Sequence, residues 1–364
     1  MKHKVCYVLP EYREDASTHF SYIGKLLETA GRDLDIFLVI LRGEKPKSDL
    51  GCSKIVVLNG SNFLIRNAKL KYWFFWARLK GYRDFYVHYS FFAAFVAKVF
   101  FARVFYWNCG EPWKFKRSFF RERFERLVYA SIDFLVTGAP LLADEYAKHY
   151  SVKRERIKIM PNWIDLARFR GLPDKVALRK ELGLPEDKKI VLFAHRLSPR
   201  KGSRMILPVM GGVLEKRSDA YFAIVGNGPD EALLRARLGN SSPLKTSVRV
   251  FGAVANRDIQ KYFAAADVYF MPSREEGFPR TILESMASGI PVVGSDVGAV
   301  REILPKTQTS YIFSPEDEKG FARGLLEVLS LYPWQLDEVK KELHDRAAEF
   351  DTSKGVKKFI ELFL

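Results

Sequence analysis

The sequence alternates short apolar runs with helical patterns along almost its whole length. Six runs in the first half are typical of strands: "KVCYVLP", "DIFLVIL", "KIVVLNG", "DFYVHYS", "RVFYWN" and "DFLVTGA". Six more follow a break: "KKIVLFAHR", "YFAIVGNG", "VRVFGAV", "DVYFMPS", "PVVGSDV" and "SYIFSP". Strand–helix alternation predicts parallel sheets with helices on both faces. Two such series predict an α/β protein made of two doubly wound domains.

The break between the two series lies near "LARFRGLPDKVALRKELGLPEDKK", where prolines and charges interrupt the strand pattern. A chain of 364 residues is long enough for two domains of ordinary size. We therefore expect an N-terminal domain over residues 1–168 and a second domain over 169–348, with a helix in the closing stretch 349–364. Ligands of such sheets bind beyond the carboxyl ends of the strands, so the expected site is a cleft between the domains.

Charge is unevenly placed along the chain. The net charge is +16, and residues 1–170 carry 30 Lys and Arg against 17 Asp and Glu. A basic first half indicates an anionic partner: phosphate, a membrane surface or nucleic acid. No RNA-binding signature or zinc spacing supports nucleic acid, so none is expected. Three cysteines without ligand spacing favour a reducing cytoplasm over a disulfide framework.

The most apolar segment, "SFFAAFVAKVFFARVFYW" at residues 90–107, is interrupted by Lys98 and Arg103. It falls short of the roughly 20 uncharged residues that a membrane span needs. We expect a buried helix followed by a strand, and a membrane span is the less favoured alternative.

The segment "EEGFPRTILE", residues 275–284, carries the strongest functional signal. Pro279 suits a first helical turn, and Gly277 lets backbone approach a ligand closely. The free N–H groups at such a helix start form an anion site. Glu276 and Glu284 could each accept hydrogen bonds from sugar hydroxyls. Taken alone, each acid could equally be a cap or a surface residue.

Two further turns follow predicted strands. "VLFAHRLSPRKG" ends in Arg196, Arg200 and Lys201, cations that suit a diphosphate near a helix start. A solvated basic turn is the competing interpretation. "VGNGPDEALL" places Gly226 and Gly228 between a strand and a helix, where backbone could approach a nucleotide. A plain turn accounts for this short pattern as well.

The order of these segments resembles a family 4 glycosyltransferase of the GT-B fold. The resemblance rests on "HRLSPRKG", "VGNGPDE", "FGAVANRDIQKYFAAADVYFMPS" and "REEGFPRTILESMASGIPVVGSDVGAVREIL", with "PNWIDLARF" similar to the linker of that family. It is dense from about residue 130 to 305 and diffuse before. It implies two Rossmann-like domains that face each other across a cleft. It also implies a C-terminal helix, 349–364, that crosses back to the first domain.

The resemblance implies retaining transfer of a sugar from a nucleotide-sugar donor to a glycan or a lipid-linked acceptor. Arg196 and Lys201 would bind the diphosphate, and Glu284 the ribose. Glu276 and the backbone after it would hold the transferred sugar, and the base would lie near Gly252. The implied donor-binding positions are Arg196, Lys201, Gly226, Gly228, Ala253, Val254, Glu276, Gly277, Phe278, Pro279 and Glu284.

The expected chemistry follows from where charge develops. The leaving nucleotide diphosphate becomes more negative in the transition state, so Arg196, Lys201 and the helix start would stabilise it. The departing phosphate could take the acceptor proton, which requires no dedicated nucleophile. The lone Asp-x-Asp, Asp33 to Asp35, is better explained as a solvated strand start. We expect no metal and no other cofactor.

The first half departs from the family pattern. The loop after the first strand, "PEYREDASTHFSYIG", lacks the usual glycines; Thr18 or His19 could contact phosphate or acceptor, or could cap a helix and pack in the core. Glu111, in "YWNCGEPWKFKR", is either a catalytic acid near the acceptor hydroxyl or a helix-start acid. His88 is a cleft candidate or a core histidine.

Two segments rich in both Lys/Arg and aromatics leave the location open: "KLKYWFFWARLKGYRDF" and "WKFKRSFFRERFERLVY". They predict amphipathic helices with aromatics in the core, or attachment to anionic lipid that would suit a lipid-linked acceptor. The leading hypothesis is a cytoplasmic glycosyltransferase of cell-envelope polysaccharide synthesis, peripheral on the inner face of the membrane in the second case. The alternatives are a nucleotide-sugar epimerase on the same fold, or a basic protein that binds membrane surfaces or nucleic acid.

Overall fold

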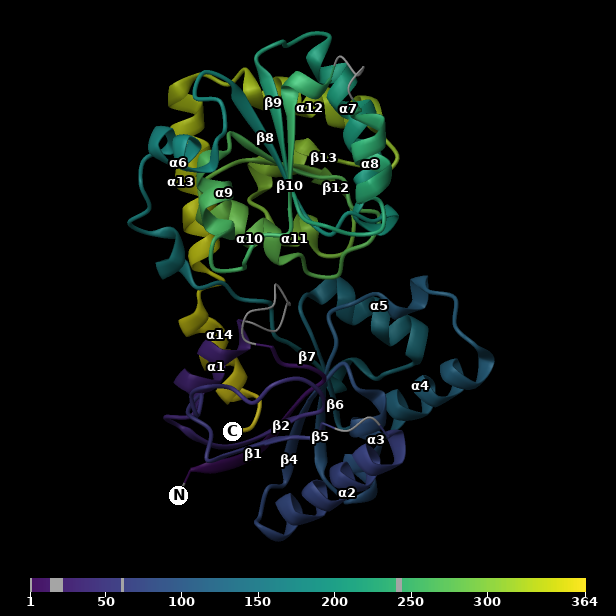
Figure 1. The fold of residues 1–364 in the computed structure, drawn as a ribbon. Coiled ribbons are helices and arrows are strands. Elements are labelled where there is room, and N and C mark those ends of the chain that lie inside the picture. Colours follow the sequence, from purple (N-terminus) through teal and green to yellow (C-terminus); the bar gives the residue numbers. More distant parts are fainter. Residues whose placement is uncertain (1, 14–21, 60–61, 240–243) are drawn as a thin grey trace. The chain divides into compact units, whose positions relative to one another are not determined.

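The computed structural model describes residues 2–13, 22–59, 62–239 and 244–364, which form two compact units (Figure 1). Unit 1 comprises Met1–Asn162 together with Thr352–Leu364, and unit 2 comprises Trp163–Asp351. The domain bounds expected from the sequence, 168/169 and 348/349, lie a few residues from these.

Unit 1 is built on a parallel sheet of seven strands in the order β3-β2-β1-β4-β5-β6-β7. Its strands are β1 (His3–Leu9), β2 (Leu34–Ile40), β3 (Lys54–Val57), β4 (Asp84–His88), β5 (Arg103–Trp107), β6 (Phe134–Thr137) and β7 (Ile157–Ile159). Six of these match the strands predicted from the first half. The seventh, β7, was missed because it is three residues long, lies at the sheet edge and has an exposed Lys158 at its centre.

Helices cover both faces of the first sheet (Figure 1). The helices of unit 1 are α1 (Ile23–Ala30), α2 (Phe63–Leu79), α3 (Phe91–Val99), α4 (Phe119–Ser131), α5 (Pro140–Tyr150) and α14 (Thr352–Glu361). The helices α2, α3, α4 and α5 lie on one face, and α1 and α14 on the other. The helix α14 and the turn after it pack on the sheet through aromatic rings: Phe359 of α14 contacts Tyr86 at 5.0 Å between centroids, and Phe363, two residues after the helix, contacts Phe105 at 5.0 Å.

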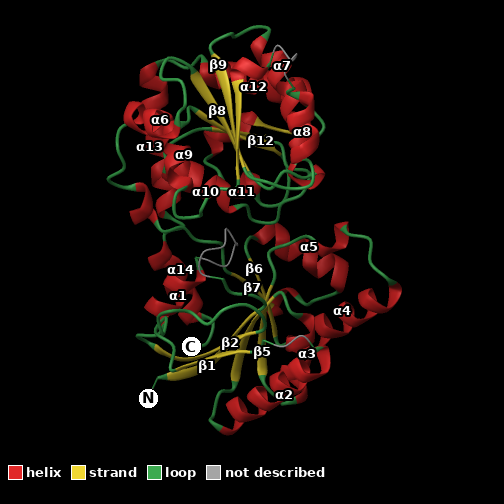
Figure 2. Cartoon of the chain, in the orientation of Figure 1, coloured by secondary structure: helices red, strands yellow, loops and turns green. Residues whose placement is uncertain are grey.

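Unit 2 repeats this topology with a parallel sheet of six strands in the order β10-β9-β8-β11-β12-β13 (Figure 2). Its strands are β8 (Lys189–Ala194), β9 (Ala220–Val225), β10 (Val248–Gly252), β11 (Val268–Met271), β12 (Val292–Ser295) and β13 (Ile312–Phe313). All six match predicted strands. Its helices are α6 (Lys175–Leu182), α7 (Ile206–Leu214), α8 (Glu231–Arg237), α9 (Ile259–Ala265), α10 (Arg280–Ala287), α11 (Val300–Ile303), α12 (Glu318–Leu329) and α13 (Pro333–Ala348).

Local sequence explains where these elements begin and end. The central strands are continuous apolar runs, as expected where helices bury both faces of a parallel sheet. Several helices start at a side chain that accepts a backbone N–H: Asn62 before α2, Ser90 before α3, Ser118 before α4 and Asp174 before α6. Residues 90–107 form the end of one loop, the helix α3 and the strand β5, as predicted. Across the described residues, no helix is long and apolar enough to cross a membrane.

Glycines let the turn after β9 lie against the segment after β8. Gly226 has a φ of +132°, and a Cβ there would lie 1.9 Å from the carbonyl oxygen of His195. Gly228 has a φ of +155°, and its Cβ would lie 2.3 Å from the carbonyl oxygen of Leu197. The close approach is fixed by a hydrogen bond from the Leu197 N–H to the Asn227 carbonyl, at 2.8 Å.

We expect Gly226→Ala to lower the free energy of unfolding by at least about 2 kcal/mol, because it adds both a backbone clash and a disfavoured φ. Urea denaturation measures this. The control is Gly211→Ala in α7, where a Cβ meets nothing within 4 Å and should stabilise the helix by up to about 1 kcal/mol. Equal effects of the two substitutions would contradict the packing described for this turn.

Candidate functional site

The candidate site of unit 2 lies at the carboxyl ends of β8 and β11. These strands are neighbours in the sheet although two strands, β9 and β10, lie between them in the sequence, so the strand order reverses between them. Such a reversal leaves a crevice beyond the strand ends, which is where doubly wound sheets bind ligands. The loop after β8 carries His195 and Lys201, and the loop after β11 carries Glu276.

The carboxylate of Glu276 joins these two loops. Its Oε1 atom lies 2.5 Å from Lys201 Nζ and 3.0 Å from His195 Nε2, and it accepts a 2.9 Å hydrogen bond from the Ser273 hydroxyl. Glu276 is only 9% exposed. Within the described part of the chain, no hydrogen bond reaches its second oxygen, Oε2. Oε1 therefore has three partners, whereas Oε2 has no hydrogen-bond partner among the described residues.

Charges around Glu276 decide its protonation. Burial alone would raise the pKa of Glu276, but Lys201 and His195 outweigh it and hold that pKa well below its ordinary value. Burial and the Lys201 ammonium lower the pKa of His195, against the opposing pull of Glu276. At neutral pH the cluster therefore holds an ionised Glu276 and a neutral His195, with Lys201 as the cation.

Backbone packing forces the two loops together. Gly202 has a φ of +70°, and a Cβ there would lie 1.8 Å from the Pro272 carbonyl oxygen. The Arg274 N–H donates to the Arg200 carbonyl at 2.9 Å. On the other side, a Cβ at Gly298 would lie 2.0 Å from the carbonyl oxygen of Glu276. Glu276 can occupy this position only because Gly202 and Gly298 have no side chains.

The segment after Glu276 leads directly into α10. Phe278 is 7% exposed and packs against Phe350, with 5.8 Å between ring centroids. Pro279 was expected in the first helical turn, but it is the N-cap residue, with an extended ψ of 121°, and α10 begins at Arg280. The difference is one residue, and the backbone N–H groups at the start of α10 remain the expected anion donors.

Glu284 lies one turn into α10. Burial raises its pKa to about 7, against the opposing effects of Arg280 and Arg168. Arg280 precedes it by four residues on the same helix face. Arg168, in the short 3-10 helix Leu166–Phe169, donates to the Asn256 carbonyl and to Gln260 Oε1, which holds it beside α9. Arg168 was not singled out from the sequence, although it lies inside the "PNWIDLARF" segment.

The remaining donor positions surround the same strand ends. Arg196 is exposed just after β8, and among the described residues no hydrogen bond or ion pair engages its guanidinium. Gly252 ends β10 with a φ of +76°, and its carbonyl accepts the Gly226 N–H at 2.7 Å. Ala253 is exposed and Val254 half-buried in the next turn. All of these positions follow the carboxyl ends of strands in one sheet.

In unit 1, His88 lies at the end of β4 and is fully buried. Its Nε2 atom lies 2.7 Å from the Tyr7 hydroxyl, and its ring stacks on Trp107 with 4.6 Å between centroids. The sequence left His88 as either a cleft residue or a core histidine, and these contacts fit the core histidine.

Glu111 follows β5 in a loop that is anchored to its neighbours. It is 8% exposed, and its Oε1 atom pairs with Lys114 Nζ at 2.9 Å. It occupies the N-cap of a short 3-10 helix, Pro112–Lys114, without capping it through its side chain. The neighbouring Gly110 donates to Asn108 at 2.9 Å and accepts from Tyr146 at 2.9 Å.

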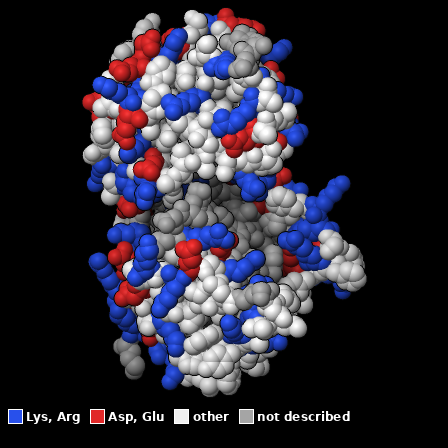
Figure 3. Space-filling view, in the orientation of Figure 1, with Lys and Arg blue, Asp and Glu red and all other residues white. Residues whose placement is uncertain are grey.

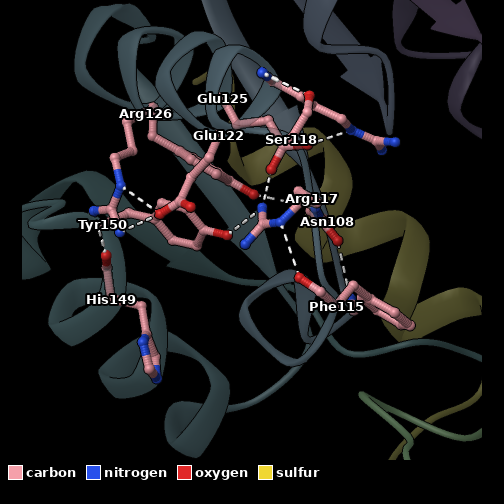
Figure 4. Close-up of polar contacts among 12 residues, drawn as sticks. Asn108, Phe115, Arg117, Ser118, Glu122, Glu125, Arg126, His149 and Tyr150 are labelled. Carbon is pink, nitrogen blue, oxygen red and sulfur yellow. Dashed lines mark hydrogen bonds and ion pairs between the residues drawn. The ribbon is translucent and has the colours of Figure 1, made fainter.

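The far end of this loop is held by a buried ion pair between Arg117 and Glu125 (Figure 4). Arg117 also donates to the Tyr150 hydroxyl at 2.9 Å, and Arg121 pairs with Glu125 at 3.0 Å. Arg126 joins α4 to α5 by donating to the His149 carbonyl at 2.8 Å. Both ends of the loop that carries Glu111 are therefore fixed.

Thr18 and His19 lie outside the described residues. Within the described parts, no three His, Cys, Asp or Glu side chains are grouped so that they could hold a metal ion. Sequence reasoning missed His195, Ser273 and Gly298 as parts of the Glu276 site. Each lies inside a quoted segment, so its position after a strand was the available signal.

We expect Glu284→Gln to stabilise the protein more at pH 8 than at pH 5. Because the pKa of Glu284 is raised to about 7, the folded protein binds this proton more tightly than the unfolded chain does. The stability that this proton provides is fully present below the ordinary carboxyl pKa, and it is lost as pH rises through 7. The difference between the two pH values should be about 2 kcal/mol. Urea unfolding at both pH values measures it, with the exposed Glu215→Gln as the matched control. A difference no larger than that of the control would contradict the partly buried placement of Glu284.

Comparison with known proteins supports one family. Residues 174–363 match the family described as glycosyl transferases group 1. The chain is 30% identical over 213 residues to the D-inositol 3-phosphate glycosyltransferase of Streptomyces avermitilis, covering 55% of this chain and 45% of that protein. It is 30% identical over 202 residues to the putative teichuronic acid biosynthesis glycosyltransferase TuaC of Bacillus subtilis, covering 55% and 48%. The chain thus matches about half the length of these relatives.

Solved structures share the fold over the full length of both chains. HepE of Anabaena, crystallised with UDP-glucose, superposes with a TM-score of 0.80 at 17% identity, covering 99% of this chain and 98% of that one. WaaG, a glycosyltransferase involved in lipopolysaccharide biosynthesis, gives a TM-score of 0.76 at 16% identity, covering 99% of each. Both sheets therefore have the Rossmann-like arrangement of the GT-B fold, and the family match covers more than half of the chain. The chain belongs to the glycosyl transferases group 1 family.

Proposed function

We propose that this protein is a retaining, metal-independent glycosyltransferase that moves a sugar from a nucleotide-sugar donor to a glycan or lipid-linked acceptor. The observation that carries the proposal is the carboxylate of Glu276, held by Lys201, His195 and Ser273 where the strand order of unit 2 reverses. Related proteins support the donor class, since HepE was crystallised with UDP-glucose. The names of TuaC and WaaG support a role in envelope polysaccharide synthesis.

In this proposal unit 2 binds the donor. The free Oε2 of Glu276 accepts a hydrogen bond from the transferred sugar, together with the backbone of Gly277, Phe278 and Pro279. Glu284, ionised above a pKa of about 7, accepts from the two ribose hydroxyls. The base lies over the turn after β10, near Ala253 and Val254.

The reaction is driven by charge on the leaving diphosphate. In this proposal the exposed Arg196 binds one phosphate, and Lys201 moves from Glu276 to a phosphate oxygen. These cations and the start of α10 stabilise the negative charge that develops as the glycosidic bond breaks. They fulfil the role that a divalent metal would otherwise have. The departing phosphate takes the acceptor proton on the same face of the sugar, so the anomeric configuration is retained.

Unit 1 provides the acceptor side in this proposal. Glu111 is held in a fixed loop beyond the end of β5. In this proposal its carboxylate accepts a hydrogen bond from the acceptor hydroxyl and orients it. The reaction takes place in the cytoplasm, at the inner face of the membrane where the acceptor is lipid-linked.

A thermal-shift screen with UDP-, GDP-, ADP- and dTDP-sugars, with and without EDTA, tests donor binding. We expect one nucleotide class to stabilise the protein equally with and without EDTA. Glu284→Ala should abolish the shift, and the matched Glu215→Ala should keep it. Stabilisation that EDTA removes would contradict metal independence.

A product assay tests the reaction with the stabilising donor and lipid or oligosaccharide acceptors. Transfer with the anomeric configuration of the donor is expected, and Lys201→Ala should lower kcat by at least about 100-fold because it removes a cation from the leaving group. Lys216→Ala, an exposed position in unit 2, is the control. Conversion of the donor into another free sugar nucleotide without acceptor would instead identify an epimerase, and an inverted product would overturn retention.

A further inference from the structure

The helix α2 is apolar on two opposite faces. Its inner face packs Leu70, Phe74 and Ala77 into the core of unit 1. Its outer face carries a second stripe at helical spacing that remains exposed to solvent, namely Leu64 (72%), Tyr72 (60%), Phe75 (51%) and Leu79 (69%). A surface helix normally has one apolar face, and a helix that is apolar all round is normally buried. The outer stripe therefore calls for a partner outside the chain.

The stripe continues onto the end of α3. Phe75 contacts Phe100 with 6.1 Å between ring centroids, and Arg78 Nε donates to the Phe100 carbonyl at 2.9 Å, so the two helix ends are adjacent. Next to them Val99 is 56% exposed and Phe101 88% exposed. Phe101 adopts the left-handed conformation, with a φ of +57°, at the position after the helix where glycine is most favoured. A bulky, fully exposed ring at a strained position is a cost that folding alone does not explain.

A third helix on the same face of the sheet has the same character. The helix α4 packs beside α3 through Phe95 and Phe124, 5.7 Å apart between centroids. At its start Phe119 is 68% exposed and Phe120 82% exposed. The "outer surface of α2–α4" below means Leu64, Tyr72, Phe75, Leu79, Val99, Phe101, Phe119 and Phe120.

Positive charge accompanies these apolar residues. The helix α2 contains four Lys and Arg residues and no Asp or Glu over its 17 residues. By helical spacing Lys71 lies on one side of the exposed stripe and Lys69 on the other. On the face drawn in Figure 3, the region over α2 is largely uncharged, with Lys and Arg beside it. Apolar rings flanked by cations suit the boundary between acyl chains and anionic headgroups.

We propose that the outer surface of α2–α4 rests on an anionic lipid bilayer, with Phe75 and Phe101 inserted between headgroups and the flanking lysines on the phosphates. A second copy of the same chain is a poorer occupant, because two such faces would bring together cations that no acid on α2 compensates. The inference deepens the proposed function by naming the surface that meets the membrane, and it does not depend on the donor site.

Vesicle co-sedimentation of the whole protein tests this proposal. We expect strong binding to vesicles of equal parts phosphatidylcholine and phosphatidylglycerol, and little to phosphatidylcholine alone. Raising NaCl from about 0.1 M to about 1 M should weaken the binding, because it screens the charges. Phe75→Ser/Phe101→Ser and, separately, Lys69→Glu/Lys71→Glu should each lower the partition coefficient at least about tenfold.

Matched controls come from exposed positions of unit 2. Leu233→Ser/Trp334→Ser removes two exposed apolar side chains, and Lys216→Glu/Lys319→Glu reverses two exposed lysines. Both should bind within about twofold of the wild type, since they leave α2 untouched. Circular dichroism and the donor-induced thermal shift of each variant establish that it is folded and that its donor site is intact.

Three outcomes would overturn the proposal. Equal binding to neutral and anionic vesicles would remove the role of the lysines. Equal losses in the test variants and the controls would remove the role of this surface. Absence of vesicle binding, together with a concentration-dependent dimer that Phe75→Ser/Phe101→Ser dissociates, would assign the surface to a second copy. A failed donor shift with intact vesicle binding would contradict the proposed function alone.

Discussion

A buried negative charge organises unit 2. The carboxylate of Glu276 lies almost out of contact with water, where an unpaired ion would cost several kcal/mol. Lys201, His195 and Ser273 compensate that cost. They come from the loops after β8 and β11, the neighbouring strands between which the strand order reverses. The two loops can approach so closely only because Gly202 has no side chain to meet the Pro272 carbonyl, and Gly298 likewise lets the loop after β12 lie against the Glu276 backbone. The residues around this site are therefore explained by the need to hold the ionised carboxylate of Glu276 in a fixed position.

Unit 1 has the same order over six of its seven strands but different side chains at their carboxyl ends. Where unit 2 places an acid among cations, unit 1 places His88 between Tyr7 and Trp107 in a fully packed aromatic cluster. Its polar network lies farther along, where Arg117 and Glu125 fix the loop after β5. The two halves therefore divide the tasks: the second concentrates charge, and the first presents a rigid loop. The same topology supports both because the strands only position the loops that follow them.

The sequence predicted most of the fold and the outline of the site. Twelve strands could be located because each is a continuous apolar run between helical patterns, which burial of both sheet faces requires. The strand β7 could not, since an edge strand of three residues with a central lysine has no such run. Glu276 and Lys201 were predicted from their motifs, and the structure brings them together. Sequence could not tell that one oxygen of Glu276 has three partners, nor that Arg168 lies near Glu284, because both depend on contacts between distant segments. His195, Ser273 and Gly298 were overlooked for the same reason.

The helix α14 completes unit 1 although it follows unit 2 in the sequence, and this affects the order in which the two units can fold. Phe359 of this helix and Phe363 just after it cover Tyr86 and Phe105 of the first sheet, yet the whole of unit 2 is synthesised between these two parts of unit 1. While the ribosome is still making unit 2, one face of the first sheet has only α1 to shield its aromatic residues from water. Unit 2 can complete its own core before unit 1 can. The nascent unit 1 should therefore depend on chaperones until α14 has left the ribosome, and loss of α14 should harm unit 1 more than unit 2.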